Sequence, residues 1–258
     1  MAEGEPPRIY EVAEPQAPLR RAPSPDAGLD TEALKGERVA VFEITDEGWA
    51  RARLESDGYE GFLPASALAP LGAAPTHKVI ALRTLVFPGP SSRLPPIEAL
   101  PLGAWLAIAR SEGSFAVTAG GGYVPARHLA PIGMNETDFV AVAERFVGTP
   151  YLWGGKTSFG LDCSGLVQVA LNACGIASPR DSAVQEQALG QPLPSATDLS
   201  SLRRGDFMFW KGHVAIVRDQ TTLIHANAFH MAVAIDPTGE ALARIGAAGS
   251  EVTSIRRL

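Results

Sequence analysis

The stretch PYLWGGKTSFGLDCSG, residues 150–165, holds the residue best suited to covalent chemistry, Cys163. A glycine-rich loop precedes this cysteine, and an apolar run at helical spacing follows it, ending near Gly175. We therefore expect Cys163 at a helix N-terminus, where unpaired amides and the positive end of the helix dipole favour thiolate over thiol. Glycine lets a backbone pass close to a ligand or to another strand, and the loop has three of them: Gly154, Gly155 and Gly160.

A cysteine nucleophile needs a base, and the sequence offers two histidines downstream. GHVAIV and TLIHA are typical of short strands joined by the turn RDQT, and they carry His213 and His225. On neighbouring strands, the first imidazole can hold Cys163 as an ion pair while the second orients the first. The alternative is that Cys163 is a small buried apolar residue and both histidines are hydrogen-bonded residues of a sheet.

Composition excludes several other classes of protein. The 258 residues allow one large domain or two to three small ones, and a net charge of −6 gives no reason to expect nucleic acid or a membrane surface as partner. The two cysteines, if they share one straight helix, lie roughly 16 Å apart, beyond disulfide reach. No CxxC or HExxH spacing occurs, so we expect no metal and no other cofactor.

The N-terminus has neither the basic segment nor the apolar core of a signal peptide, and no run is long enough to span a membrane. We therefore expect a cytoplasmic protein, or a periplasmic or secreted one if a leader has been removed.

The first half of the chain has the pattern of short β-strands. Residues 1–18, rich in Pro and Glu, are expected to form an extended arm. FLPASALAPL at 62–71 returns as YVPARHLAPI at 123–132, which indicates an internal repeat. The expected fold is therefore two small β-barrels, residues 19–72 and 73–133.

Residues 134–258 have a different pattern from the first half, with helical periodicity first and strands later. TDFVAVAERFVG places an apolar face on a helix that Asn135 or Thr137 can cap. A polar stretch at 178–202 is expected to be a loop, and four or more strands follow it. This order predicts an α+β domain in which a helix packs on an antiparallel sheet.

Several motifs together resemble a known family. PYLWGG, FGLDCSGLV, LRRGDFMFW, GHVAIV and LIHAN are similar to the NlpC family of papain-like cysteine peptidases, which cut bacterial cell-wall peptides. GYEGFLP at 58–64 resembles the final segment of bacterial SH3 domains. Tandem SH3-like domains ahead of such a peptidase further resemble the subgroup that cleaves the γ-D-glutamyl–L-diamino acid bond of short murein peptides with a free N-terminal L-Ala.

The resemblance implies roles for individual residues. Cys163 would be the nucleophile, His213 the base and later acid, and His225 the third member that holds the imidazole tautomer. The backbone amide of Cys163, with the side chain of Tyr151, would face the oxyanion. Contacts to substrate are implied for Asp162, Ser164, Asp181, Ser182, Tyr59 and an early acidic residue, for which we choose Asp30 over Glu32.

Some of these residues also have plain structural interpretations. Asp162 can cap the following helix, Asp181 and Ser182 can begin another, and Asp30 can be a solvated loop charge. His77, His128 and His230 are expected to be structural or solvent-facing, and Cys174 to lie in the core.

The sequence thus predicts a cysteine endopeptidase of short wall peptides, active in their recycling. The alternatives are a secreted D,L-endopeptidase acting on intact peptidoglycan, with SH3 domains as wall-binding modules, and a catalytically inert wall-peptide binding protein. The preferred diamino acid, diaminopimelate or lysine, and the oligomeric state are left open by the residues.

Overall fold

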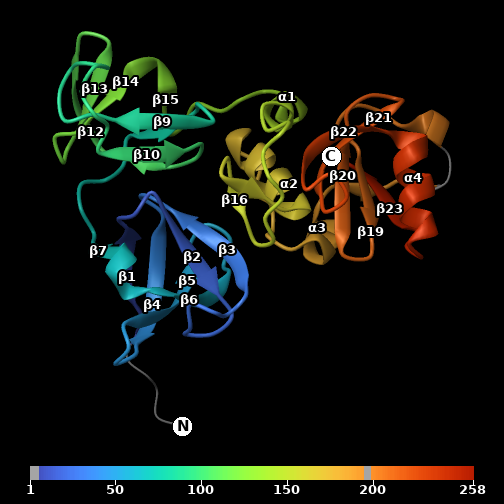
Figure 1. The fold of residues 1–258 in the computed structure, drawn as a ribbon, viewed down its shortest axis with the longest axis horizontal. Coiled ribbons are helices and arrows are strands. Elements are labelled where there is room, and N and C mark those ends of the chain that lie inside the picture. The colour runs from blue at the N-terminus through green and yellow to red at the C-terminus, as the bar shows by residue number, and fades with distance from the viewer. Residues whose placement is uncertain (1–5, 195–198) are drawn as a thin grey trace. The chain divides into compact units, whose positions relative to one another are not determined.

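A computed structural model describes residues 6–194 and 199–258. The chain divides into two compact units, Met1–Met134 and Asn135–Leu258, and each is described by itself. Figure 1 shows strands throughout the first unit and a mixture of helices and strands in the second. None of the helices in the described ranges is both long and apolar enough to cross a membrane.

The first unit begins with a seven-stranded sheet in the order β3-β2-β6-β5-β4-β1-β7, paired antiparallel throughout. The predicted strands RVAVFEI and WARARL are confirmed as β4 and β5, whose buried alanines, valines and leucines form one core. The strands are β1 (Arg8–Val12), β2 (Gln16–Arg20), β3 (Leu29–Leu34), β4 (Arg38–Ile44), β5 (Trp49–Leu54), β6 (Glu60–Pro64) and β7 (Leu68–Pro70).

The predicted N-terminal arm is wrong for residues 8–18, while residues 1–5 lie outside the described residues. β1 pairs with β4 and β7, and β2 pairs with β3, so this segment belongs to the sheet. Val12 and Ala17 are fully buried in its core. The Pro- and Glu-rich composition concealed a short alternation of apolar and polar residues, which is enough for a strand when neighbouring strands supply the other half of the core.

A second β-domain follows in the same unit, with a core of its own. Its closing segment repeats that of the first domain: β14, a short 3-10 helix (Ala126–His128) and β15 match β6, a 3-10 helix (Ala65–Ala67) and β7. The strands are β8 (His77–Val79), β9 (Arg83–Val86), β10 (Glu98–Pro101), β11 (Trp105–Leu106), β12 (Ile108–Glu112), β13 (Phe115–Thr118), β14 (Tyr123–Pro125) and β15 (Leu129–Pro131).

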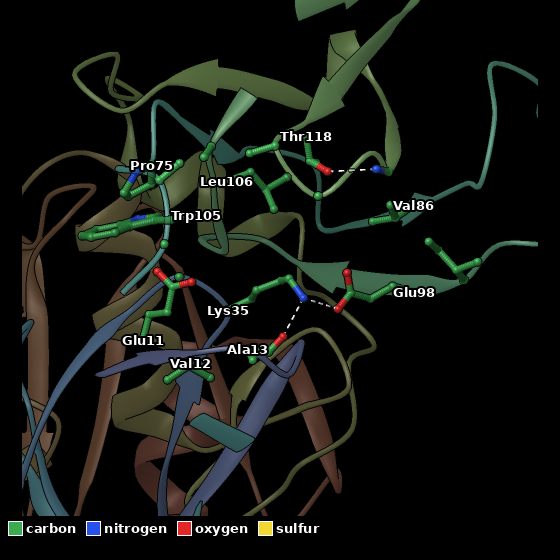
Figure 2. A pocket seen from close by; sticks show the side chains of 18 residues that line it. Glu11, Val12, Ala13, Lys35, Pro75, Val86, Glu98, Trp105, Leu106 and Thr118 are labelled. Atoms are coloured by element: carbon green, nitrogen blue, oxygen red, sulfur yellow. Dashed lines mark hydrogen bonds and ion pairs between the residues drawn. The ribbon is translucent and has the colours of Figure 1, made fainter. Parts of the chain in front are cut away.

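The two β-domains touch around Lys35. Its ammonium donates to the Ala13 carbonyl and to the Glu98 carboxylate, each at 2.5 Å, and its backbone carbonyl accepts from the Trp105 N–H at 2.8 Å. Figure 2 shows these side chains around a pocket of about 420 Å³. At Gly36 a Cβ would lie 2.5 Å from the Trp105 carbonyl oxygen, so glycine permits this approach.

The second unit is built on a six-stranded antiparallel sheet in the order β18-β23-β19-β20-β21-β22. Helices α1 and α2 pack together, α2 also covers β20 and β21, and α4 packs on β21 and β22 (Figure 1). The helices are α1 (Phe139–Glu144), α2 (Cys163–Ala173), α3 (Ser182–Ala188) and α4 (Thr238–Ala247). The strands are β16 (Lys156–Thr157), β17 (Gly160–Leu161), β18 (Gln191–Pro192), β19 (Phe207–Trp210), β20 (His213–Val217), β21 (Thr222–Asn227), β22 (Ala232–Pro237) and β23 (Val252–Arg257).

This arrangement confirms the predicted helix on an antiparallel sheet, but it corrects the expected helix cap and the number of helices. The N-cap of α1 is Asp138, which accepts from the N–H groups of Val140 and Ala141, rather than Asn135 or Thr137. Helix α3 occupies part of the stretch expected to be a loop, and α4 was not expected at all. Both helices are short, and α3 buries the polar Gln185 while its Val184 is exposed, so contacts with the rest of the domain stabilise them more than their own propensity does.

Candidate active site

Cys163 is the first residue of α2, as the sequence predicted. Asp162 caps this helix by accepting from the Gly165 N–H at 2.7 Å. The preceding loop presses directly on the helix, because a Cβ at Gly165 would lie 2.2 Å from the Gly155 carbonyl oxygen and one at Gly155 would lie 2.4 Å from that of Gly160. The glycines therefore serve close packing of the chain on itself, which fixes the position of the nucleophile.

Beneath the nucleophile lies a buried ion pair. Arg180 donates to both oxygens of Asp162, at 2.9 and 2.7 Å, and also to the Gly155 carbonyl and the Ser164 hydroxyl. The second Asp162 oxygen also accepts from the Gly154 N–H at 2.8 Å. Arg180 is 1% exposed in its side chain and Asp162 11%. The pair thus ties the glycine-rich loop, the start of α2 and the segment before α3 together.

The thiol of Cys163 is not the low-pKa group that its helix position suggested. Burial raises its pKa to about 11, and the charge of Asp162 acts in the same direction. The backbone N–H groups of Val214 and Ser164 and the charge of Arg180 lower the pKa, but burial outweighs them. The amides at the start of α2 do lower the pKa of the Cys163 thiol, but by less than burial raises it, because the cysteine is only 7% exposed.

His213 and His225 lie on the paired strands β20 and β21, as predicted. His213 Nε2 is 2.8 Å from His225 Nδ1, and His225 Nε2 is 2.9 Å from a carboxylate oxygen of Asp236. The N–H of Val214, the residue after His213, is one of the two that face the Cys163 sulfur. Cysteine, imidazole, imidazole and carboxylate therefore occupy one region of the second unit.

Burial also keeps the first histidine neutral. The pKa of His213 is lowered to about 3, first by burial and then by the neighbouring His225 and Arg244. Both His213 and Cys163 are therefore neutral at rest, in place of the ion pair that the sequence predicted. The arrangement can still perform nucleophilic catalysis, because an unprotonated ring nitrogen can take the thiol proton as the sulfur attacks.

Tyr151 supplies a phenol near this cluster. Burial raises its pKa to about 12, and the charges of Cys163 and Asp162 add to the rise, so its hydroxyl stays a hydrogen-bond donor. In the described part of the chain no acceptor takes the Cys163 N–H, which is one of the first amides of α2. Both donors are of the kind that stabilises an oxyanion.

Comparison with known proteins identifies the domains. The model of the NlpC/P60 family matches residues 148–243, and that of the bacterial dipeptidyl-peptidase SH3 domain matches residues 19–68. The second unit is an NlpC/P60 domain. The first β-domain is an SH3 domain of the bacterial dipeptidyl-peptidase type.

Similar proteins include a dipeptidyl-peptidase 6 of Lysinibacillus sphaericus, 39% identical over 88 residues, which are 34% of this chain and 31% of that protein. A γ-D-glutamyl-L-lysine dipeptidyl-peptidase of Bacillus subtilis is 29% identical over 72% of this chain and 65% of its own length. The chain thus spans less than two thirds of either relative. The crystal structure of an NlpC/P60 family protein from Bacillus cereus has the same fold, with a TM-score of 0.79 and 20% identity over 97% of this chain and 99% of that one.

The other predicted substrate residues are distributed over both units. In the NlpC/P60 domain the Ser164 hydroxyl donates to Asp162 at 3.3 Å, Asp181 is the N-cap residue of α3 without a side-chain cap bond, and Ser182 begins that helix. In the first unit Asp30 accepts from Arg21 at 2.9 Å, and Tyr59 packs against the core of the SH3 domain. Contact of any of them with a substrate stays a prediction.

Sequence reasoning missed four residues of the NlpC/P60 domain that hold the site: Arg180, Asp236, Arg244 and His230. Arg244 donates to Asp236 at 2.6 Å, and His230, expected to lack such a role, lies 3.4 Å from the same carboxylate. A carboxylate in the otherwise apolar strand AVAIDP was the one signal available for Asp236. Cys174 is only half-buried rather than a core residue. No group of side chains that could hold a metal ion is found within residues 6–194 and 199–258.

The two neutral histidines predict that the NlpC/P60 domain loses stability in mild acid. Burial lowers the pKa of both His213 and His225 below the value of about 6.5 of an unfolded chain. The unfolded state therefore takes up these protons first, so the stabilisation is complete above pH 6.5 and is lost as the pH falls towards the lower folded-state values. Each histidine contributes a slope of at most about 1.4 kcal/mol per pH unit.

The loss is measured by urea unfolding at pH 7, 6 and 5, in which hydrogen exchange at the amides of β20 and β21 reports the unfolding of this domain. His225→Gln should flatten the pH dependence, because it removes one of the two titrating groups. Equal stability at all three pH values would show that the rings are protonated without cost in the folded domain.

Proposed function

We propose that the chain is a cysteine peptidase that hydrolyses the γ-D-glutamyl–L-diamino acid bond of short cell-wall peptides. The observation that carries this proposal is that Cys163, at the start of α2, faces the N–H of Val214, the residue next to His213 of the hydrogen-bonded pair His213–His225. The family of the domain supports cell-wall peptidase chemistry, and the name of the Bacillus subtilis relative supports the bond.

In the first step the thiol of Cys163 transfers its proton to the ring of His213 as the sulfur attacks the γ-carbonyl of D-glutamate. His213 Nε2 is engaged by His225, which leaves Nδ1 as the nitrogen that takes the proton. The negative charge that develops on the carbonyl oxygen is stabilised by the Cys163 N–H and the Tyr151 hydroxyl. Proton transfer during the attack avoids a separately charged thiolate in a buried site.

In the second step the tetrahedral intermediate collapses. The C–N bond breaks, the imidazolium of His213 returns its proton to the leaving amine of the diamino acid, and a thioester to Cys163 remains. His213 then takes a proton from water, whose oxygen attacks the thioester. The C–S bond breaks, and His213 returns this proton to the sulfur of Cys163, which restores the neutral thiol and the neutral imidazole. The products are the L-Ala-γ-D-Glu dipeptide and the remaining diamino acid fragment.

The substrate's N-terminal ammonium needs a carboxylate whose charge is not already compensated. Asp162 does not meet that need, because Arg180 binds both of its oxygens. Our proposal therefore assigns the ammonium to Asp30 and Tyr59 of the SH3 domain, because Arg21, which is 60% exposed, contacts one oxygen of Asp30 and leaves the other for the ammonium. Asp30 is partly exposed, whereas Glu32 is only 4% exposed. The second β-domain, which we propose is also SH3-like, would act as a spacer.

The proposal predicts strong selection for a free N-terminus. Acetylation of L-Ala-γ-D-Glu-L-Lys removes the ammonium and with it the charged contact to the recognition carboxylate, so kcat/KM should fall by about 10²-fold or more. Mass spectrometry of the released dipeptide measures the cleavage rate of the free and of the acetylated peptide. The same assay on the diaminopimelate peptide tests the second diamino acid.

Asp30→Asn should reduce this discrimination, and Glu32→Gln serves as the matched neighbouring variant. Equal cleavage of the acetylated peptide would remove the proposed recognition of the amine. Cleavage of purified intact peptidoglycan at a rate comparable with the free peptide would favour the endopeptidase alternative instead.

A further inference from the structure

A buried carboxylate stands behind the two histidines. Strand β22 runs antiparallel to β21, with Ala234 opposite His225 and Asp236 opposite Leu223. Asp236 is therefore the diagonal neighbour of His225 on the same face of the sheet. It is 5% exposed, and its Oδ2 lies 2.9 Å from His225 Nε2.

An ionised carboxylate can only accept hydrogen bonds, and this fixes the protons of both rings. His225 must carry its proton on Nε2 in order to donate to Asp236. Since burial lowers the pKa of His225 and keeps the ring neutral, its Nδ1 is then an acceptor. His213 Nε2, 2.8 Å away, must donate to it. The lone pair of His213 consequently lies on Nδ1, the nitrogen that must take the thiol proton.

Without the carboxylate the opposite arrangement becomes available. A proton on Nδ1 of His225 would point at His213 Nε2 and force that nitrogen to accept. The proton of His213 would then sit on Nδ1, where it prevents the ring from acting as a base. The direction of the hydrogen bond between His225 and Asp236 thus decides, through the His225 ring, whether Nδ1 of His213 can accept a proton.

Arg244 and the hydrogen bond from His225 hold the Asp236 carboxylate ionised. Arg244 of α4 donates to Oδ2 at 2.6 Å, and His230 Nε2 lies 3.4 Å from Oδ1. Burial raises the pKa of Asp236, but the hydrogen bonds from His225 and Arg244 lower it by more, so the net shift is downward. Arg244 is itself held over the ring of Phe229, at 4.3 Å from its centroid. The charged and titratable groups that act on the two rings are thus Asp236, Arg244 and His230.

We propose that Asp236 is a positioning residue that, held by Arg244, orders the protons of His225 and His213 so that His213 Nδ1 is the base. This inference rests on the proposed cysteine peptidase function for its kinetic consequence. Its statement about ring protons is independent of that function, because it stands on the hydrogen-bond geometry together with the neutral state of the buried His225 ring.

The unmodified full-length chain provides the first test. Nitrogen-15 NMR of labelled histidines at pH 7 should show His213 and His225 protonated on Nε2 and unprotonated on Nδ1. Single His213→Gln and His225→Gln variants assign the signals. A proton on Nδ1 of His213 would overturn the proposal whether or not the chain cleaves any peptide, and absence of cleavage with the expected tautomers would count against the proposed function alone.

Asp236→Asn provides the second test, because an amide can also donate and so permits the other tautomer. We expect kcat on the free peptide to fall by about 10²- to 10⁴-fold with KM nearly unchanged, and His213 to show a population protonated on Nδ1. Glu240→Gln, which removes an exposed carboxylate from α4, is the matched control and should keep full activity.

If Asp236→Asn does not fold, Arg244→Gln loosens the same carboxylate and should shift the tautomers in the same direction with a smaller loss of kcat. Normal tautomers and normal kcat in whichever variant folds would overturn the proposal.

Discussion

Replacing Cys163 by alanine is expected to abolish hydrolysis of L-Ala-γ-D-Glu-diamino acid peptides, lowering kcat by at least about 10³-fold. The substitution removes the one sulfur that lies at the N-terminus of α2 and faces the amide of Val214. It should cost only about 1 kcal/mol of stability, because a small buried side chain is shortened by one atom. Peptide binding should survive, since the recognition residues are untouched.

Cys174→Ala is the matched control, because it makes the same change at the half-buried C-terminal end of the same helix. Its activity should equal that of the unmodified chain. Dipeptide release that persists in Cys163→Ala would remove the cysteine peptidase assignment. Normal peptide binding with no turnover by the unmodified chain would instead support the catalytically inert alternative.

Replacing Arg180 by methionine is expected to have the largest effect on stability, about 3–5 kcal/mol. The substitution keeps much of the side-chain volume but leaves the Asp162 carboxylate buried without its bidentate partner. The same change frees the carbonyl of Gly155 from its hydrogen bond to Arg180, so the loop that presses on α2 should loosen and activity should fall as well. Urea unfolding followed by exchange at the amides of α2 measures the loss.

Arg145→Met is the corresponding surface control, because Arg145 and Glu136 are paired at 2.8 Å with 37% and 32% of their side chains exposed. It should change stability by less than about 1 kcal/mol. Adding Asp162→Asn to Arg180→Met should recover part of the loss, since it removes the uncompensated charge. An Arg180→Met variant as stable as Arg145→Met would show that Asp162 finds another partner or becomes protonated at little cost.

The reactive cysteine and both histidines could be predicted from the sequence because each lies in a local pattern. A glycine-rich loop followed by apolar residues at helical spacing indicates a helix start at Cys163, and two short apolar runs around a polar turn indicate paired strands. These patterns depend on residues within about ten positions of one another. The structure confirmed the helix and the strand pairing for that reason.

The partners of those residues could not be predicted, because they come from distant parts of the chain. Arg180 follows Asp162 by eighteen positions, in a polar stretch expected to be a loop. Asp236 meets His225 only because β22 pairs with β21 in one particular register, and a shift of one residue would turn its side chain to the other face. Arg244 reaches it from α4, a helix that was not expected from the sequence.

By itself, the sequence determined which side chains can react and on which kind of element each lies, because local periodicity and turn residues specify helices and strands. Only the tertiary structure decided the state of those side chains. The helix terminus alone favours a thiolate at Cys163, but burial by segments far apart in the chain raises the pKa of the thiol to about 11 and keeps His213 neutral. Desolvation is a sum over everything that packs around a group, and no local pattern contains that sum.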